Sequence, residues 1–412
     1  MSLRTKRILI VVMDGLGDRG CEELGWKTPL QYADTPNLDW FTANGSAGVV
    51  DIIAPGVRPG SDTAHLSILG YDPYKVYTGR GPFEAAGIGL ISKKGDVAFR
   101  CNFATVNDRL EITDRRAGRV KTPDTSELVR SLEGLKIEGV ECIVREGTEH
   151  RAALILRGPG LSADITDADP HDLGPIAISK GRSPEAQFTA GVVNKFVLAT
   201  YKRLKDHPVN VRRRAAGLPE ANIILPRGAG EFPRLEPFPE INSMTAGCVA
   251  GVGMIKGICA VCGLDVIDVP PCCSGGTDSD FMSKARTALE ALETHEFILM
   301  NCKAPDVCGH DGCALSKVDV VRRLDEMAGY IKDNMPEDLV IVFTADHSTP
   351  CGTGDHSADP VPMTIYTKGN VIDEAVKFSE SGCARGRLGR IRGHDIVRIC
   401  MDLANRTEKF GA

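Results

Sequence analysis

Continuous apolar runs followed by helical patterns occur near the start of the chain. Residues 6–13 form such a run, which ends at Asp14 and predicts a buried parallel strand with a carboxylate at its C-terminal end. Residues 49–53 predict a second strand. A helical repeat of apolar positions then begins after Gly60 and ends at Gly70.

The middle of the chain, from residue 92 to 208, has a different pattern. Short strand-like pieces and turn clusters dominate it, and one long amphipathic helix is expected over 184–205. Runs of strands with few helices are typical of an α+β unit. Strands and helices alternate again after residue 209. The expected strands are 222–225, 266–269, 297–301, 339–344 and 363–366, and the expected helices are 244–262, 278–294, 316–334 and 393–404.

This order predicts an α/β protein, in which a doubly wound domain is interrupted by a smaller α+β insert. We expect the first segment of the doubly wound domain over residues 1–90 and its second segment over 211–412. The insert, over residues 91–210, is expected to act as a cap or substrate domain.

Composition excludes several classes of protein. Of the 412 residues, 42% are hydrophobic and 25% are charged, which excludes a disordered, fibrous or coiled-coil chain. A net charge of −6 and an aromatic content of 5% argue against a nucleic-acid partner. No apolar stretch is long enough to span a membrane, and the run at 8–13 is too short for a signal peptide. We therefore expect a cytoplasmic protein with fourteen reduced cysteines.

Some of these cysteines invite a further interpretation. Cys259 and Cys262 lie in a run that resembles a buried helix, and the spacing to Cys272-Cys273 lacks the second pair of a zinc site, so we do not expect structural zinc. Four other cysteines lie near the acidic and histidine residues described next. They either only pack in the interior or make the site sensitive to oxidation. These cysteines are Cys302, Cys308, Cys313 and Cys351.

Aspartates and histidines follow several predicted strands. Ligands bind outside the carboxyl ends of strands in open α/β sheets, so we expect these side chains to meet at one edge. With Ser61 they provide seven oxygen and nitrogen donors, and this set fits two divalent metal ions. Carboxylate with imidazole suits Mn²⁺ or Zn²⁺ better than Mg²⁺. The seven residues are Asp14, Ser61, Asp306, His310, Asp346, His347 and His356.

Ser61 is the candidate nucleophile. It stands where a helix is predicted to begin, and there backbone N–H groups and the helix dipole favour a phosphate. A metal ion can activate its hydroxyl without a histidine base. The alternative is that Ser61 only caps the helix, and the metal-ligand pattern favours the nucleophile.

Basic side chains near glycines are candidates for binding phosphate or carboxylate. Arg80 and Arg227 are flanked by glycine, Lys303 follows a predicted strand, and Arg214 lies in a basic run that also fits a solvated surface. The segment 167–171, Asp-Ala-Asp-Pro-His, fits either a plain turn or a general base near a phosphate site.

Together these segments resemble the archaeal-type cofactor-independent phosphoglycerate mutases of the alkaline phosphatase superfamily. The resemblance runs from residue 8 to about 400. The metal motifs are common to the superfamily, whereas Gly-Arg-Gly-Pro-Phe-Glu-Ala at 79–85 and the segment 167–171 point to the mutases. The other matching segments are 12–18, 59–65, 306–312, 344–350 and 354–362.

The resemblance implies an isomerase of glycolysis and gluconeogenesis with an alkaline-phosphatase-like catalytic domain. Its small-molecule substrate is phosphoglycerate: 3-phosphoglycerate and 2-phosphoglycerate are interconverted through a phosphoserine, without 2,3-bisphosphoglycerate. Manganese is the expected metal, with magnesium, zinc and cobalt as alternatives. One ion is held by Asp14, Ser61, Asp346 and His347, and the other by Asp306, His310 and His356. Asp169 is the implied acid and base, and the implied substrate ligands are Asp62, Arg80, His171, Arg214, Arg227 and Lys303.

Two other functions remain open at this point. A phosphatase, phosphopentomutase or phosphonate hydrolase of the same superfamily shares the metal motifs, but the insert and Arg80 favour the mutase. A non-catalytic metal- or phosphate-binding protein does not need Ser61 together with all the metal ligands. The long predicted helices leave association into a homo-oligomer open.

Overall fold

A central strand, β1 (Arg7–Met13), organises the first of two sheets. The computed structural model describes residues 5–411 and divides them into one unit of residues 5–76 with 235–411 and a second unit of residues 77–234. In the first unit the strand order is β11-β10-β12-β1-β13-β14-β2-β15. The remaining strands are β2 (Ser46–Asp51), β10 (Ala246–Val249), β11 (Asp265–Val266), β12 (Phe297–Cys302), β13 (Leu339–Thr344), β14 (Val361–Tyr366) and β15 (Gly389–Arg392).

Burial on both faces explains the continuous apolar run of β1. Residues 8–13 are 0% exposed, and β1 pairs in parallel with β12 on one side and β13 on the other. Only a strand covered by helices on both faces needs such a run. β14 is antiparallel to both of its neighbours, so the sheet is mixed.

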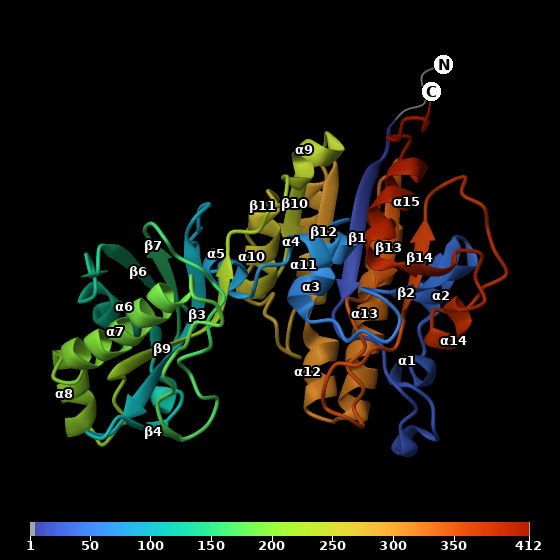
Figure 1. Cartoon of the computed structure of the whole chain (residues 1–412). Helices are drawn as coiled ribbons and strands as arrows, with labels where there is room; N and C mark the ends of the chain where they lie inside the picture. Colours follow the sequence, from blue (N-terminus) through green and yellow to red (C-terminus); the bar gives the residue numbers. More distant parts are fainter. Residues whose placement is uncertain (1–4, 412) are drawn as a thin grey trace. The chain divides into compact units, whose positions relative to one another are not determined.

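Helices cover both faces of this sheet, which confirms the doubly wound α/β class (Figure 1). α13 packs against α1, α2, α11 and α12, whereas α3 packs against α10. The helices of the unit are α1 (Pro29–Tyr32), α2 (Pro36–Ala43), α3 (Ser61–Ile68), α4 (Pro73–Val76), α9 (Phe238–Asn242), α10 (Gly253–Val261), α11 (Phe281–Ala291), α12 (Ala304–His310), α13 (Ala314–Asn334), α14 (Glu380–Cys383) and α15 (Ile396–Leu403), with 3₁₀ turns at Glu22–Leu24 and Gly393–Asp395.

The predicted helix over 244–262 is wrong in its first half. β10 occupies 246–249 and pairs with β12, and α10 begins only at Gly253. A strand buried on both faces and a buried helix both read as unbroken apolar sequence, so periodicity does not separate them. Cys259 and Cys262 are buried on α10 and directly after it.

The second unit contains an antiparallel sheet with the order β5-β6-β7-β3-β4-β8, in which β9 also pairs with β3. Its strands are β3 (Val97–Val106), β4 (Glu111–Asp114), β5 (Lys136–Ile137), β6 (Val140–Glu146), β7 (Arg151–Arg157), β8 (Gly174–Pro175) and β9 (Ile223–Glu231). Its helices are α5 (Gly81–Ala86), α6 (Thr122–Arg130), α7 (Gln187–Leu204) and α8 (Pro208–Ala215), with a 3₁₀ turn at Ala117–Arg119.

The bounds of this unit, 77 and 234, differ from the predicted bounds of the insert at 91 and 210. α5 packs on β3, so residues before 91 lie with this unit. The strand expected at 222–225 is part of β9, which pairs antiparallel with β3 and does not belong to the doubly wound sheet. Sequence alternation does not reveal which sheet a strand joins.

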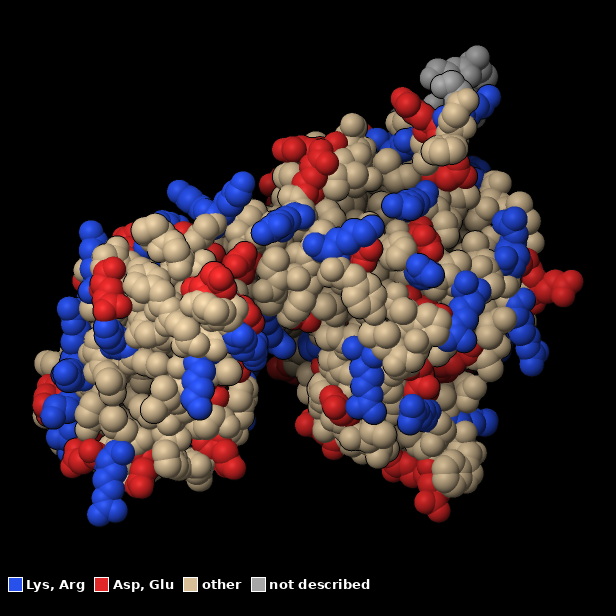
Figure 2. Space-filling view, viewed as in Figure 1, with Lys and Arg blue, Asp and Glu red and all other residues tan. Residues whose placement is uncertain are grey.

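Acidic and basic side chains are mixed on both units in the view of Figure 2. Within residues 5–411, no helix combines the length and the apolar character that crossing a membrane requires.

Candidate active site

Three buried carboxylates meet at the carboxyl ends of neighbouring strands. Asp14 follows β1, Asp306 lies in α12 after β12, and Asp346 follows β13. Their exposed fractions are 0%, 2% and 0%. The parallel register of β1 with β12 and β13 brings together residues that are about 300 positions apart in the sequence.

The ammonium group of Lys303 lies among these carboxylates. Its Nζ atom is 2.7 Å from Asp14 Oδ1 and 2.8 Å from Asp306 Oδ2, and it donates a hydrogen bond to Ser61 Oγ at 3.2 Å. Burial opposes the charge of Lys303, but the carboxylates of Asp14, Asp346 and Asp306 raise its pKa above the ordinary value. Burial and the nearby Asp346 also raise the pKa of Asp14.

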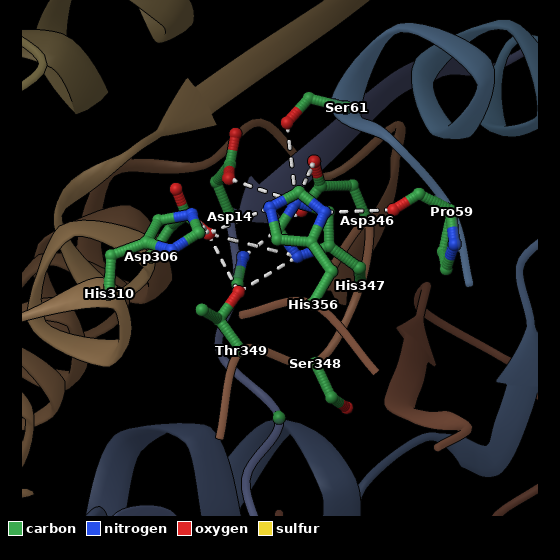
Figure 3. Close-up of polar contacts among 12 residues, drawn as sticks. Asp14, Pro59, Ser61, Asp306, His310, Asp346, His347, Ser348, Thr349 and His356 are labelled. Carbon is green, nitrogen blue, oxygen red and sulfur yellow. Dashed lines mark hydrogen bonds and ion pairs between the residues drawn. The ribbon is translucent and has the colours of Figure 1, made fainter. Parts of the chain in front are cut away.

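Three histidines surround the carboxylates and Ser61 (Figure 3). His347 Nε2 is 3.2 Å from Ser61 Oγ and 3.3 Å from Asp346 Oδ2. His356 Nε2 and His310 Nε2 lie 3.5 Å and 3.4 Å from Asp306 Oδ1. Burial lowers the pKa of His347 to about 3, so its ring is neutral at pH 7.

Backbone carbonyls fix the tautomers of the two outer histidines. His356 Nδ1 is 2.8 Å from the Pro59 carbonyl oxygen, and His310 Nδ1 is 2.8 Å from that of Gly354. A carbonyl only accepts, so Nδ1 carries a hydrogen in each ring, and Nε2 is the nitrogen that faces Asp306. This is the usual arrangement around metal-binding histidines.

The residues present fit divalent metal ions. Among residues 5–411, two groups have ligand atoms within 4.8 Å of one another: Asp306 with His347 and His356, and Asp14 with His65 and Asp346. Asp346 Oδ2 is buried and has no hydrogen-bond partner. A bare buried carboxylate oxygen is costly unless a cation lies beside it. The donor set of carboxylate oxygens and imidazole nitrogens suits manganese or zinc.

The second unit carries a basic cavity of about 430 Å³. The buried Nε atoms of Arg100, Arg115 and Arg227 have no hydrogen-bond partner. Burial and the positive charges of Arg227 and Arg80 lower the pKa of Arg100 to about 10, against the opposing effect of Glu84. The cavity thus has a surplus of positive charge that suits an anion. Its lining residues are Arg100, Asn102, Arg115, Arg116, Arg119, Glu149, His150, Arg151, His171 and Arg227.

The segment 167–171 lies beside this cavity. Buried Asp169 accepts hydrogen bonds from the His171 backbone at 2.9 Å and from Arg115 Nη2 at 3.3 Å. Arg227 Nη1 lies 3.1 Å from His171 Nδ1, which must be the acceptor because a guanidinium only donates. His171 Nε2 therefore carries the hydrogen and donates to Asp167 Oδ2 at 3.1 Å.

Comparisons with known proteins point to one family. A family model described as 2,3-bisphosphoglycerate-independent phosphoglycerate mutase matches residues 42–210. The chain is 46% identical over 415 residues to 2,3-bisphosphoglycerate-independent phosphoglycerate mutase 1 of Methanocaldococcus jannaschii, with 100% of both chains covered. It is 49% identical to the 2,3-bisphosphoglycerate-independent phosphoglycerate mutase of Methanopyrus kandleri, with 99% and 98% covered. The chain belongs to this mutase family.

Two solved structures share the fold. The PH0037 protein from Pyrococcus horikoshii has a TM-score of 0.86 at 38% identity, and 100% of both chains is covered. The cofactor-independent phosphoglycerate mutase from Thermoplasma acidophilum has a TM-score of 0.74 at 38% identity, with 97% of this chain and 100% of that chain covered.

The two sets of metal ligands that the resemblance implies differ from the two groups of neighbouring ligand atoms in the structure. Ser61 and His310 lie outside the two groups, and His347 falls with Asp306 and His356. His65, which no sequence argument singled out, falls with Asp14 and Asp346. Side-chain spacing alone therefore does not divide the donors between two ions as the resemblance implies.

The residues that the resemblance implies as substrate ligands lie in different parts of the structure. His171 and Arg227 line the basic cavity, and Lys303 lies beside Ser61. Asp62 is buried next to Ser61, where its Oδ1 accepts the Thr63 amide hydrogen. Arg80 donates a hydrogen bond to Glu84, and Arg214 donates two to Glu220. Neither arginine lines the cavity.

Most of the arginines that line the cavity are not among the binding residues predicted from the sequence. Arg115, Arg116 and Arg119 lie in a turn where Ala117, Gly118 and Arg119 all have positive φ angles. Proximity to a glycine singles out Arg80 and Arg227, and the same criterion applies to the arginines of residues 115–119. Arg100 and Arg151 lie within strands, and nothing in their sequence surroundings marks them.

Proposed function

We propose that this chain interconverts 3-phosphoglycerate and 2-phosphoglycerate, a step of glycolysis and gluconeogenesis, without 2,3-bisphosphoglycerate. The reaction proceeds through phosphorylated Ser61 and requires divalent metal ions. One observation carries the proposal: Ser61 Oγ lies within 3.2 Å of both His347 Nε2 and Lys303 Nζ, at the first residue of α3. Family membership supports the substrate and the absence of an organic cofactor.

Asp14, Asp346, His347, Asp306, His310 and His356 would hold the metal ions together with Ser61. When bound, the ions supply positive charge that favours the alkoxide of Ser61 and stabilises the transferring phosphoryl group. The hydrogen bond from Lys303 favours the same alkoxide. The N-terminus of α3 adds backbone N–H groups that suit phosphate oxygens.

The reaction has two balanced halves. Ser61 Oγ attacks phosphorus, the bond from phosphorus to the C3 oxygen breaks, and that oxygen takes a proton. The C2 hydroxyl then loses a proton as its oxygen attacks the phosphoserine, and Ser61 Oγ is released. We assign both proton transfers to Asp169. Its carboxyl group gives its proton to the C3 oxygen in the first half, and the resulting carboxylate takes the proton of the C2 hydroxyl in the second. Donors from Arg115 and His171 stabilise that carboxylate.

The basic cavity supplies the charge that binds the substrate anion. Replacing Arg227 with lysine removes a planar donor pair and is expected to raise the KM for 3-phosphoglycerate about 10–100-fold, as for loss of a hydrogen bond to a charged group. Steady-state kinetics at saturating metal measure this change. Arg203→Lys is the control, since Arg203 is exposed, donates a hydrogen bond to the Ser131 carbonyl and does not line the cavity. An unchanged KM in Arg227→Lys contradicts the assignment of the cavity.

Metal-depleted protein tests the whole proposal. It is incubated with 3-phosphoglycerate and with Mn²⁺, Mg²⁺, Zn²⁺ or Co²⁺ in turn, and 2-phosphoglycerate and free phosphate are followed together. We expect 2-phosphoglycerate only after metal is returned, with little free phosphate. Free phosphate alone would place the chain among phosphatases, and the absence of both products with every metal would refute a catalytic role.

A further inference from the structure

A buried polar chain connects Asp14 with the backbone of Ser61. Asn301, on β12, donates from Nδ2 to Asp14 Oδ2 at 3.0 Å, and the same Nδ2 lies 3.2 Å from His65 Nε2. His65 Nδ1 lies 2.7 Å from the carbonyl oxygen of Ser61. The side chains of Asn301 and His65 serve neither proton transfer nor substrate binding in the reaction above, and both residues are 0% exposed.

The direction of every hydrogen bond in this chain follows from its two ends. The Ser61 carbonyl only accepts, so His65 Nδ1 carries the hydrogen and His65 Nε2 accepts. The carboxylate of Asp14 also only accepts, so the amide nitrogen of Asn301 faces it, with one hydrogen for Asp14 and one for His65. The opposite amide orientation would place Asn301 Oδ1 against the carboxylate. One arrangement therefore satisfies all three contacts with a neutral His65.

This arrangement separates His65 from the metal ligands. Its atoms lie close enough to Asp14 and Asp346 to share a metal with them, and His65 Nδ1 is 3.6 Å from Asp346 Oδ2. Both ring nitrogens are already engaged, however. As a ligand, Nδ1 would give up its hydrogen bond to the Ser61 carbonyl, and Nε2 would give up Asn301.

We propose that His65, held by Asn301, is a positioning residue that fixes the first turn of α3 and so directs Ser61 Oγ at the reacting phosphorus. The inference rests on the proposed function. Asn301 contacts a metal ligand, and His65 contacts the nucleophile's own backbone, so the two residues set the position of the nucleophile relative to the metal centre. Partners that orient metal ligands are typically worth 10–100-fold in affinity or activity.

Three substitutions of His65 distinguish its contact with the Ser61 carbonyl from its contact with Asn301. The amide of His65→Asn can place a donor near the position of Nδ1 and so still bind the Ser61 carbonyl. The amide of His65→Gln reaches the position of Nε2 and keeps the contact with Asn301 only. His65→Leu removes both. We expect kcat to fall about 10–100-fold in His65→Gln and His65→Leu, with the KM for 3-phosphoglycerate within about twofold, and His65→Asn to recover most of kcat.

Two measurements do not depend on turnover. Electron paramagnetic resonance titration with Mn²⁺ is expected to give wild-type stoichiometry in all three variants, and thermal denaturation checks that each is folded. Nitrogen-15 NMR of the wild-type imidazoles is expected to show one ring with hydrogen on Nδ1 whose signal disappears in His65→Asn. Loss of one bound Mn²⁺ in His65→Asn would make His65 a ligand and overturn the proposal.

Other results would overturn it as well. A hydrogen on Nε2 of His65 contradicts the deduced directions of the hydrogen bonds between Asp14 and Ser61, whatever the activity. Wild-type kcat in a folded His65→Leu protein, or a His65→Asn protein as slow as His65→Leu, contradicts positioning through the Ser61 carbonyl. If wild-type protein makes no 2-phosphoglycerate, the proposed function fails, while the imidazole spectrum and Mn²⁺ titration still decide the geometry.

Discussion

Replacing Ser61 with alanine is expected to lower kcat for the mutase reaction by about 10⁴-fold or more, the scale found when a covalent nucleophile is removed. The phosphoryl group then has no acceptor at the start of α3, where His347 and Lys303 converge on Ser61 Oγ. The measurement is 2-phosphoglycerate formation at saturating metal, with mass spectrometry of the peptide that contains residue 61. We expect phosphorylated peptide in the wild type and none in Ser61→Ala.

Ser67 on the same helix provides a matched control. Its Oγ donates to the Ile52 carbonyl inside the protein and contacts no residue of the candidate site among its hydrogen bonds. Ser67→Ala is expected to cost about 1 kcal/mol of stability, the worth of one hydrogen bond, and to leave kcat unchanged. Activity in Ser61→Ala within tenfold of wild type would mean that phosphate moves without a phosphoserine.

The second large effect concerns stability. Lys317→Met is expected to lower the free energy of unfolding by about 3–5 kcal/mol, because it leaves a buried charge without its partner. Lys317 and Asp18 have side chains that are 0% exposed, with Nζ 2.7 Å from Asp18 Oδ2. The same Nζ donates to the carbonyl oxygens of Gly17 and Thr349 at 3.1 Å and 2.9 Å. Urea denaturation measures the change.

Lys332→Met, on the same helix, is the control for the loss of a lysine. Lys332 is only half-buried and bonds the Asn37 side chain, so we expect a change of about 1 kcal/mol or less. Adding Asp18→Asn to Lys317→Met should restore part of the loss, since it removes the unpaired charge. Equal stability of Lys317→Met and wild type would show that this ion pair does not stabilise the fold.

Lys317 also links stability with the proposed metal centre. The carbonyl of Thr349 accepts from Lys317, and Thr349 Oγ1 donates to Asp306 Oδ1 at 2.7 Å. Displacement of Thr349 in Lys317→Met would disturb Asp306. Weaker Mn²⁺ binding should therefore accompany the lower stability.

The sequence predicts that three aspartates converge at one edge of the sheet. Asp14, Asp306 and Asp346 each follow an apolar run, and the rule that ligands bind at the carboxyl ends of parallel strands is enough to bring them together. His65, Asn301 and Lys317 carry no such signal. They lie inside regular elements, and their importance comes from contacts with residues distant in sequence.

The same limit applies to the fold. Alternation of strands and helices identifies the α/β class, but β9 and β10 show that neither the sheet a strand joins nor the type of a short apolar element follows from local pattern. The arginines of β3 and β7 reach the basic cavity only because these strands pair with each other.

The central place of β1 determines when the protein can fold during synthesis. The sheet of the second unit is complete once β9 has been made, whereas β1 must wait for β12 and β13. At about 5–20 residues per second, the roughly 300 residues between them take about 15–60 s to synthesise. Throughout this time the apolar segment 8–13 has neither neighbouring strand. It is therefore a segment of the nascent chain that is open to chaperones for most of synthesis, and the proposed metal centre can assemble only after His356 has left the ribosome.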